Sequence, residues 1–180
     1  MDGTRRTLPA SLDIKWILAS SLGWSAIAIA GELEGFVVGL LQWLVLRRLT
    51  RISPLWVAVT GITWWAGVAL ADRFSPSLFI PDLRWLAATG TAVGLFQWML
   101  LGGRRDRALL WLPVNGASAL VSWLVGFSVG FDLYERWWWS NVAYMVAAGA
   151  VGGAVAGVIT GFPLPWLLRR RARQAAAVHA

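Results

Sequence analysis

Six apolar stretches without a charged side chain follow one another along the chain, separated by short polar segments. They cover residues 16–30, 35–46, 52–71, 85–103, 108–131 and 137–168. A helix needs about 20 residues to cross the hydrocarbon core of a membrane, and flanking residues bring the shorter stretches to roughly that length. The pattern therefore predicts an all-α integral membrane fold. The predicted helices are residues 14–31, 33–50, 54–72, 84–103, 108–131 and 139–162, followed by an interfacial segment at 164–173, all in one transmembrane domain, 1–180.

The six predicted helices form three similar pairs. Gly35-Phe-Val-Val-Gly-Leu-Leu-Gln-Trp recurs as Gly90-Thr-Ala-Val-Gly-Leu-Phe-Gln-Trp, and the last pair keeps the two glycines but carries threonine in place of glutamine. The first helix of each pair has a tryptophan four residues before a small polar residue: Trp16 and Ser20, Trp56 and Thr60, Trp111 and Asn115. We predict three repeated helical hairpins in a pseudo-threefold bundle.

The charged residues lie mostly on one side of the predicted membrane. The basic residues that precede the first helix or follow the second, fourth and sixth are Arg5, Arg6, Lys15, Arg47, Arg48, Arg51, Arg104, Arg105, Arg107, Arg169, Arg170, Arg171 and Arg173. Short loops rich in lysine and arginine stay in the cytoplasm, so we expect both termini there. The net charge of +7 then reflects topology and contact with lipid headgroups, and we expect no nucleic-acid partner.

Polar side chains inside the predicted helices are the candidate site residues. Gln42, Gln97 and Thr160 occupy corresponding positions, and the small polar residues of the partner helices are Ser20, Thr60 and Asn115. An amide in hydrocarbon must find a hydrogen-bond partner, because leaving it unpaired costs several kcal/mol. These six side chains either bond between helices or form a ring of polar groups around a central ligand.

The glycines of the repeat are spaced four apart: Gly35 and Gly39, Gly90 and Gly94, Gly153 and Gly157. Small residues at this spacing allow two membrane helices to approach closely and gain packing contacts. They serve either packing within the chain or docking of a partner subunit or a lipid tail.

Fourteen tryptophans are an unusually high number for 180 residues. Those near predicted helix ends, including Trp16, Trp56 and Trp111, suit the membrane interface. The deeper ones are Trp24, Trp64, Trp65 and Trp123. Their indole N–H groups must bond inside the protein. They either pack normally or line a flat aromatic ligand such as a pigment, a quinone or a sterol-like lipid.

The chain offers no recognisable catalytic or metal-binding motif. It has no cysteine, and its single histidine, His179, lies at the C-terminal end. It also lacks a Ser-His-Asp set, a carboxylate pair and a His-Glu-x-x-His motif, so we expect neither an enzyme nor a metal site. No charged residue falls within an apolar stretch, which argues against proton or sodium coupling. We expect no cofactor other than a bound lipid or pigment.

The repeated Gly-x-x-x-Gly-Leu-x-Gln-Trp motif, with Arg47 and Arg48 after its first copy, resembles that of small uncharacterised multi-pass membrane proteins of bacteria. The resemblance implies hairpin-repeat architecture in the bacterial inner membrane and no particular activity. We therefore expect a non-enzymatic membrane subunit or scaffold that binds partner helices, lipids, another membrane protein or a pigment-bearing complex. The alternatives are a facilitative carrier or capture component for a small neutral or aromatic ligand, and a lipid-modifying enzyme.

Overall fold

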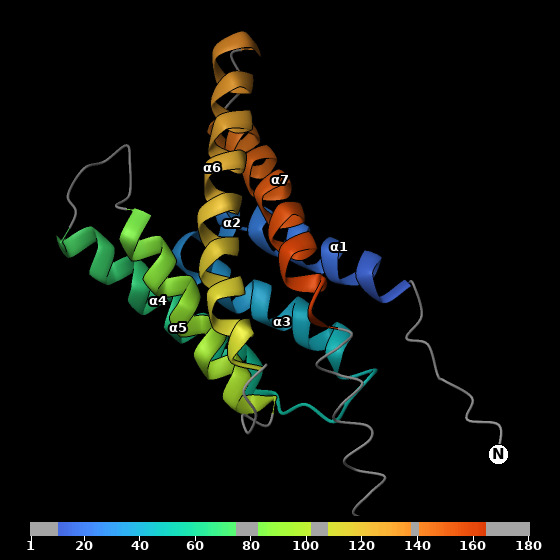
Figure 1. The fold of residues 1–180 in the computed structure, drawn as a ribbon. Helices are drawn as coiled ribbons and strands as arrows, with labels where there is room; N and C mark the ends of the chain where they lie inside the picture. The colour runs from blue at the N-terminus through green and yellow to red at the C-terminus, as the bar shows by residue number, and fades with distance from the viewer. Residues whose placement is uncertain (1–10, 75–82, 102–107, 138–140, 165–180) are drawn as a thin grey trace, which may run out of the picture.

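The computed structural model describes residues 11–74, 83–101, 108–137 and 141–164, and this part of the chain is helical throughout, without a strand (Figure 1). The long helices are α1 (Ser11–Ser25), α3 (Glu34–Leu46), α4 (Leu55–Phe74), α5 (Leu83–Leu100), α6 (Trp111–Trp137) and α7 (Asn141–Gly161). A short helix, α2 (Ile27–Ala30), and a 3-10 turn, η1 (Gly31–Leu33), join α1 to α3, and a second 3-10 turn, η2 (Ala108–Leu110), precedes α6. The predicted all-α fold is confirmed for these residues.

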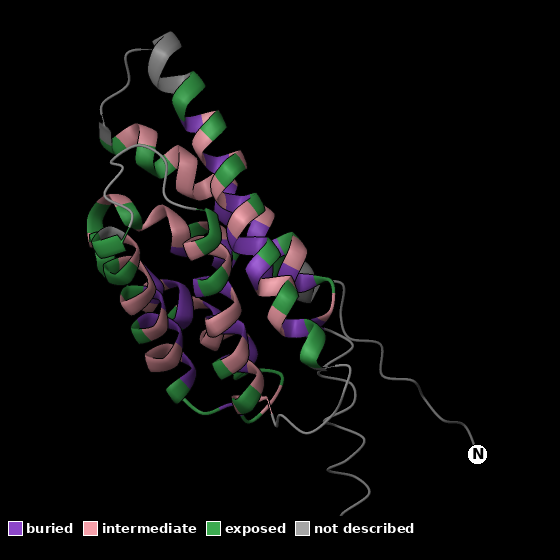
Figure 2. Cartoon of the chain, turned by 60° about the vertical axis from the view of Figure 1, so that its left-hand side comes forward, coloured by how far each residue is buried: buried purple, intermediate pink, exposed green. Residues whose placement is uncertain are grey.

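The long helices form a closed ring in space. Each packs mainly against two neighbours, in the order α1, α3, α4, α5, α6 and α7, and the contact between α7 and α1 closes the ring. Buried residues lie on the sides of the helices that face one another, and exposed residues lie on the outer sides (Figure 2). The buried core side chains therefore lie on the inner side of the helix ring.

The connection between α1 and α3 depends on one glycine. Gly31 has a φ of +52°, a conformation that residues with a Cβ rarely adopt. The helix hydrogen bonding of α1 ends at Ser25, and Gly31 reverses the chain before α3 begins at Glu34. The two predicted helices at 14–31 and 33–50 thus appear as an antiparallel pair with a compact turn.

Three helical stretches are long and apolar enough to cross a membrane: Ile14–Leu46, Trp111–Asp132 and Val142–Gly161. A fourth, shorter apolar helix covers Leu55–Ala71. Many large apolar side chains on the outside of the ring are exposed, among them Leu22, Ile62 and Val158. Such a surface suits lipid rather than water, so length and composition suggest a membrane protein.

The glycine pairs of the repeat lie at helix contacts within the chain. A Cβ added at Gly157 would lie 2.7 Å from the Cα of Ile17, and one at Gly153 would lie 2.5 Å from the carbonyl oxygen of Ser20. The other two pairs meet α4 and α6 in the same way, with Gly39 against Val57 and Thr60, and Gly94 against Leu112 and Asn115. These close approaches explain why glycine is needed in α3, α5 and α7.

One end of the ring is filled by large buried side chains. They are Trp16, Trp56, Trp111, Leu46, Ile52 and Leu164. The three tryptophans are at most 1% exposed, so they lie inside the bundle and do not face lipid as interfacial anchors. Their burial closes the centre of the ring at the end that carries Arg47, Arg48 and Arg51.

Several predicted features lie outside the described residues. They are most of the interfacial segment at 164–173 with Trp166, the basic clusters at 104–107 and 169–173, and the N-terminal Arg5 and Arg6. Trp138 and Trp139, which stand near the start of the last predicted helix, also lie outside the described residues.

Candidate functional site

A cavity lies at the centre of the helix ring. About 50 Å³ of it is open to water-sized molecules, and each of the six long helices contributes to its wall. The polar residues of the wall are Glu34, Gln42, Thr60, Gln97, Asn115, Ser118 and Thr160. A water molecule needs roughly 10–15 Å³ of such space, so the cavity has room for a few waters or a ligand of a few heavy atoms.

Gln97 stands at the centre of the best-connected polar group in the wall. Its amide nitrogen donates to Thr60 Oγ1 at 2.9 Å, and its oxygen accepts from Trp111 Nε1 at 3.3 Å. Thr60 in turn donates to the carbonyl oxygen of Trp56 at 2.8 Å. Gln97 is only 2% exposed, and these bonds tie α5 to both α4 and α6.

The remaining predicted ring residues make comparable bonds. Gln42 Nε2 donates to Ser20 Oγ at 3.3 Å, which joins α3 to α1. Trp16 Nε1 donates to Thr160 Oγ1 at 2.9 Å, which joins α1 to α7. Asn115 lines the cavity and donates to the carbonyl oxygen of Trp111 within α6 at 2.8 Å. The structure thus places five of the six predicted residues in the wall of one cavity and bonds the sixth, Ser20, to Gln42; these six residues form a polar layer with three separate groups of hydrogen bonds.

The hydrogen bonds in this layer follow a pattern. A tryptophan near the start of one helix donates to the glutamine or threonine of the neighbouring helix, as Trp111 does to Gln97 and Trp16 does to Thr160. At the corresponding place, between α4 and α3, Trp56 Nε1 and Gln42 Oε1 are both buried and have no hydrogen-bond partner within the part of the chain that the structure describes. The indole N–H of Trp56 and the amide oxygen of Gln42 are therefore available for a further hydrogen bond at the third contact, between α3 and α4.

Glu34 lies immediately before the second predicted apolar stretch, residues 35–46, and was therefore expected outside the apolar core. It is 5% exposed and lies in the cavity wall, so the expectation that no ionisable side chain enters the core is wrong here. Its Oε1 accepts from Trp64 Nε1 at 2.7 Å, whereas its Oε2 is buried without a partner among the described residues. A buried carboxylate oxygen without a hydrogen bond costs free energy, and in a membrane helix it marks a candidate site.

The signal that identifies Glu34 is its spacing from the ring residue in the same helix. Glu34, Val38 and Gln42 are four residues apart and therefore share one face of α3. All three line the cavity. Glu34 was missed because it lies next to the turn, where a carboxylate normally faces water.

The four deep tryptophans divide between different surroundings. Trp24 and Trp64 line the cavity and form an edge-to-face pair with ring centroids 4.6 Å apart. Trp65 is 46% exposed and donates to Glu32 on the outside of the turn. Trp123 stacks on Phe127 and lines a separate, mostly apolar pocket of about 410 Å³ between α6, α7 and α1. Trp24 borders this second pocket too.

Comparison with known proteins provides no further assignment. No protein-family model matches the chain, and neither a curated protein nor a solved structure matches it. Within the described residues, no group of three or more histidine, cysteine, aspartate or glutamate side chains is placed to hold a metal ion. The chemistry available at the cavity is therefore that of hydrogen bonding, one carboxyl group and two indole rings.

Proposed function

We propose that this chain is a six-span membrane protein that captures or carries a small polar molecule in its central cavity. The observation that carries the proposal is the polar cavity itself, which every long helix helps to enclose. The amides and hydroxyl groups also tie neighbouring helices together, but this bonding leaves two buried acceptors of the described wall, Glu34 Oε2 and Gln42 Oε1, without a partner. This is the carrier or capture role named above as an alternative to a scaffold, with a small polar ligand in place of the small neutral or aromatic one expected from the sequence.

The scaffold role is less favoured because the glycine pairs pack within the chain. Gly35 and Gly90 approach α4 and α6, and Gly153 approaches α1, so these pairs present no free docking face. A partner protein, a lipid or a pigment would have to use another surface. The pocket beside Trp123 is an aromatic-lined candidate for such a ligand.

The ring arrangement supports six crossings and a pseudo-threefold bundle. Helices that pack side by side in one closed ring would share the same surroundings, so the suitability of α6 and α7 for crossing a membrane supports the same placement for their neighbours. The glycine contacts and tryptophan bonds between hairpins support the threefold repeat. In this proposal, the protein lies in the bacterial inner membrane.

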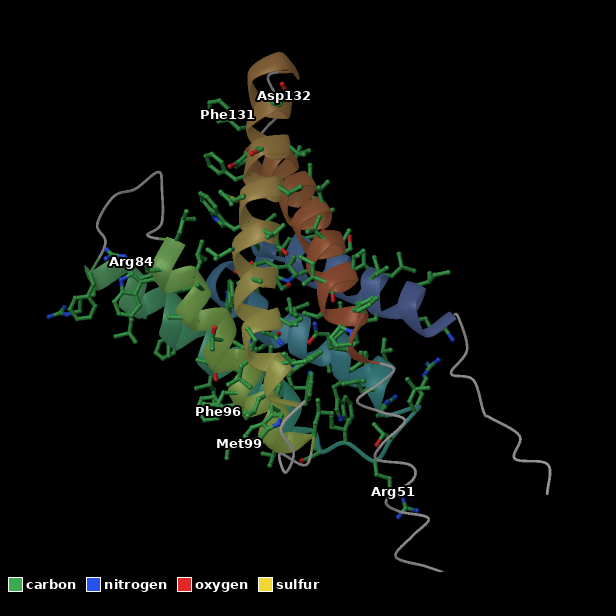
Figure 3. All side chains as sticks on the ribbon, in the orientation of Figure 1. Arg51, Arg84, Phe96, Met99, Phe131 and Asp132 are labelled. Carbon is green, nitrogen blue, oxygen red and sulfur yellow. The ribbon has the colours of Figure 1, made fainter. Side chains whose placement is uncertain are left out.

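The end closed by tryptophans faces the cytoplasm in this proposal. Arg51 lies at this end of the bundle, whereas Arg84 and Asp132 lie toward the other end (Figure 3). Basic loops favour the cytoplasmic side. Because Trp16, Trp56 and Trp111 close that end, the ligand would reach the cavity from the opposite end, near Glu34 and Trp64.

The experiment asks whether the cavity is filled with water and reachable. The chain has no cysteine, so single cysteines can be placed without background. Val93 lines the cavity and is 7% exposed; Val93→Cys should react with the small neutral reagent methyl methanethiosulfonate. The controls are Ala19→Cys, which is buried away from the cavity wall, and Val121→Cys, on the lipid-facing side.

We expect Val93→Cys to react at least about tenfold faster than both controls in the purified full-length protein, because a thiol must be hydrated to ionise and react. Mass spectrometry of the intact protein gives the rate. Equal, slow modification at all three positions would show a dry centre and would exclude the proposed function.

A further inference from the structure

We propose that the cavity binds a small ammonium-type cation, of the size of ammonium or methylammonium, between Glu34 and the Trp24–Trp64 pair. The inference rests on the proposed function and specifies its ligand class. The juxtaposition that supports it is a buried carboxyl group beside two indole rings in the wall of one cavity.

Glu34 supplies the negative charge and a free acceptor. Its Oε1 is held by Trp64 Nε1, which fixes the carboxyl group, and its Oε2 has no partner among the described residues. The described wall of the cavity contains no lysine, arginine or histidine, so no cationic side chain in it offsets a negative charge. A charge in such surroundings needs a partner, and a cationic ligand in the cavity would provide one.

The hydrogen-bonding groups of the wall favour a ligand that donates. The amide nitrogens of Gln42 and Gln97 each donate one hydrogen bond, to Ser20 and Thr60. The buried side-chain atoms without a partner in the described part of the wall are Gln42 Oε1 and Glu34 Oε2, both acceptors. An ammonium group carries only N–H donors, so it matches this set. An anionic ligand would meet acceptors and a carboxylate and would be rejected.

The two tryptophans select an ammonium ion over a metal ion. An indole face attracts a cation within about 6 Å of the ring centroid, and aromatic rings commonly recognise substituted ammonium ligands in this way. Trp24 and Trp64 pack edge to face, and both line the cavity together with Glu34. Only Glu34 among the described wall residues bears a carboxylate, so a divalent ion there would keep one uncompensated positive charge. The open space of about 50 Å³ limits the ligand to a few heavy atoms.

The test uses the purified full-length protein and methylammonium chloride as the probe, titrated by calorimetry at constant ionic strength. Glu34→Gln removes the charge but keeps an oxygen for Trp64 and the same shape. Glu32→Gln is the matched control, because Glu32 lies two residues away, exposed, and bonded to Trp65 on the outside. We expect Glu34→Gln to weaken binding at least about tenfold and Glu32→Gln to change it by less than about twofold.

A second variant keeps the test independent of any folding defect at Glu34. Trp24→Leu removes an aromatic ring while the carboxyl group and its bond to Trp64 remain, and it should weaken methylammonium binding about threefold or more. Sodium chloride at the same concentration should neither bind with comparable affinity nor displace the probe.

The inference is overturned if the wild-type protein does not bind methylammonium, if sodium competes equally, or if Glu34→Gln binds as well as the wild type. If Val93→Cys still reacts rapidly in that case, the hydrated cavity and the proposed function stand with another ligand. If Val93→Cys is also unreactive, both fail together.

Discussion

The polar layer offers a quantitative test, because its two glutamines differ in how well they are bonded. Gln97 is bonded twice, to Thr60 at 2.9 Å and to Trp111 at 3.3 Å. Among the described residues, Gln42 is bonded once, to Ser20 at 3.3 Å, and its oxygen has no partner. We predict that Gln97→Leu destabilises the fold clearly more than Gln42→Leu does.

The magnitude follows from the number of bonds lost. A hydrogen bond between membrane helices contributes about 0.6 kcal/mol on average and about 1.7 at most. Gln97→Leu removes two and leaves the buried N–H group of Trp111 without a partner, so the free energy of unfolding should fall by about 1–3 kcal/mol. Gln42→Leu removes one long bond and an unpaired oxygen, so its cost should be about 0.6 kcal/mol or less.

Unfolding with sodium dodecyl sulfate in mixed micelles, followed by far-ultraviolet circular dichroism, measures both values. A double-mutant cycle of Gln97→Leu with Trp111→Phe isolates the bond between them and should give a coupling of about 0.5 kcal/mol or more. The same cycle with Gln42→Leu should be additive. Equal losses for the two glutamine variants, or no coupling between Gln97 and Trp111, would refute the reasoning.

Two further predictions concern packing and topology. Gly153→Ala should lower the free energy of unfolding by about 1–2 kcal/mol, because its Cβ would lie 2.5 Å from the backbone oxygen of Ser20. Gly161→Ala, whose Cβ lies no closer than 3.2 Å to a side-chain atom, should be nearly neutral, and equal effects would contradict the packing. In intact cells, an impermeant maleimide should label Glu32→Cys and not Ser53→Cys; the reverse pattern would invert the proposed orientation.

The helices could be predicted from the sequence because charge-free apolar length is a local property of the chain. Trp16 and Ser20, singled out in the sequence by their spacing of four, both form hydrogen bonds to neighbouring helices, Trp16 to α7 and Ser20 to α3. The spacing of Gly153 and Gly157 indicated a close helix contact. It did not indicate that α1 was the neighbour, because no local pattern specifies which distant helix a small residue meets.

The candidate site was predicted only in part, because some of its residues stand out locally in the sequence and others do not. Gln42 and Gln97 were recognisable because an amide in an apolar stretch stands out against its neighbours. The roles of Trp56 and Trp111 were not recognisable, because a tryptophan near a helix end suits the interface and a buried core equally well. The closed arrangement of the six long helices places both indole side chains inside the bundle and brings Trp111 next to Gln97.

Glu34 occupies a position at which the three similar helix pairs carry different residues. The positions eight residues before Gln97 and Thr160, two helical turns along α5 and α7, hold Thr89 and Gly152. Both are buried, as Glu34 is, so burial there does not require a carboxyl group. Under the proposed function, a carboxyl group that burial at this position does not require is explained by the ligand that it would bind. The proposal therefore assigns the hydrogen bonds around Gln97 to the stability of the bundle and assigns to Glu34 the preference of the cavity for one kind of ligand.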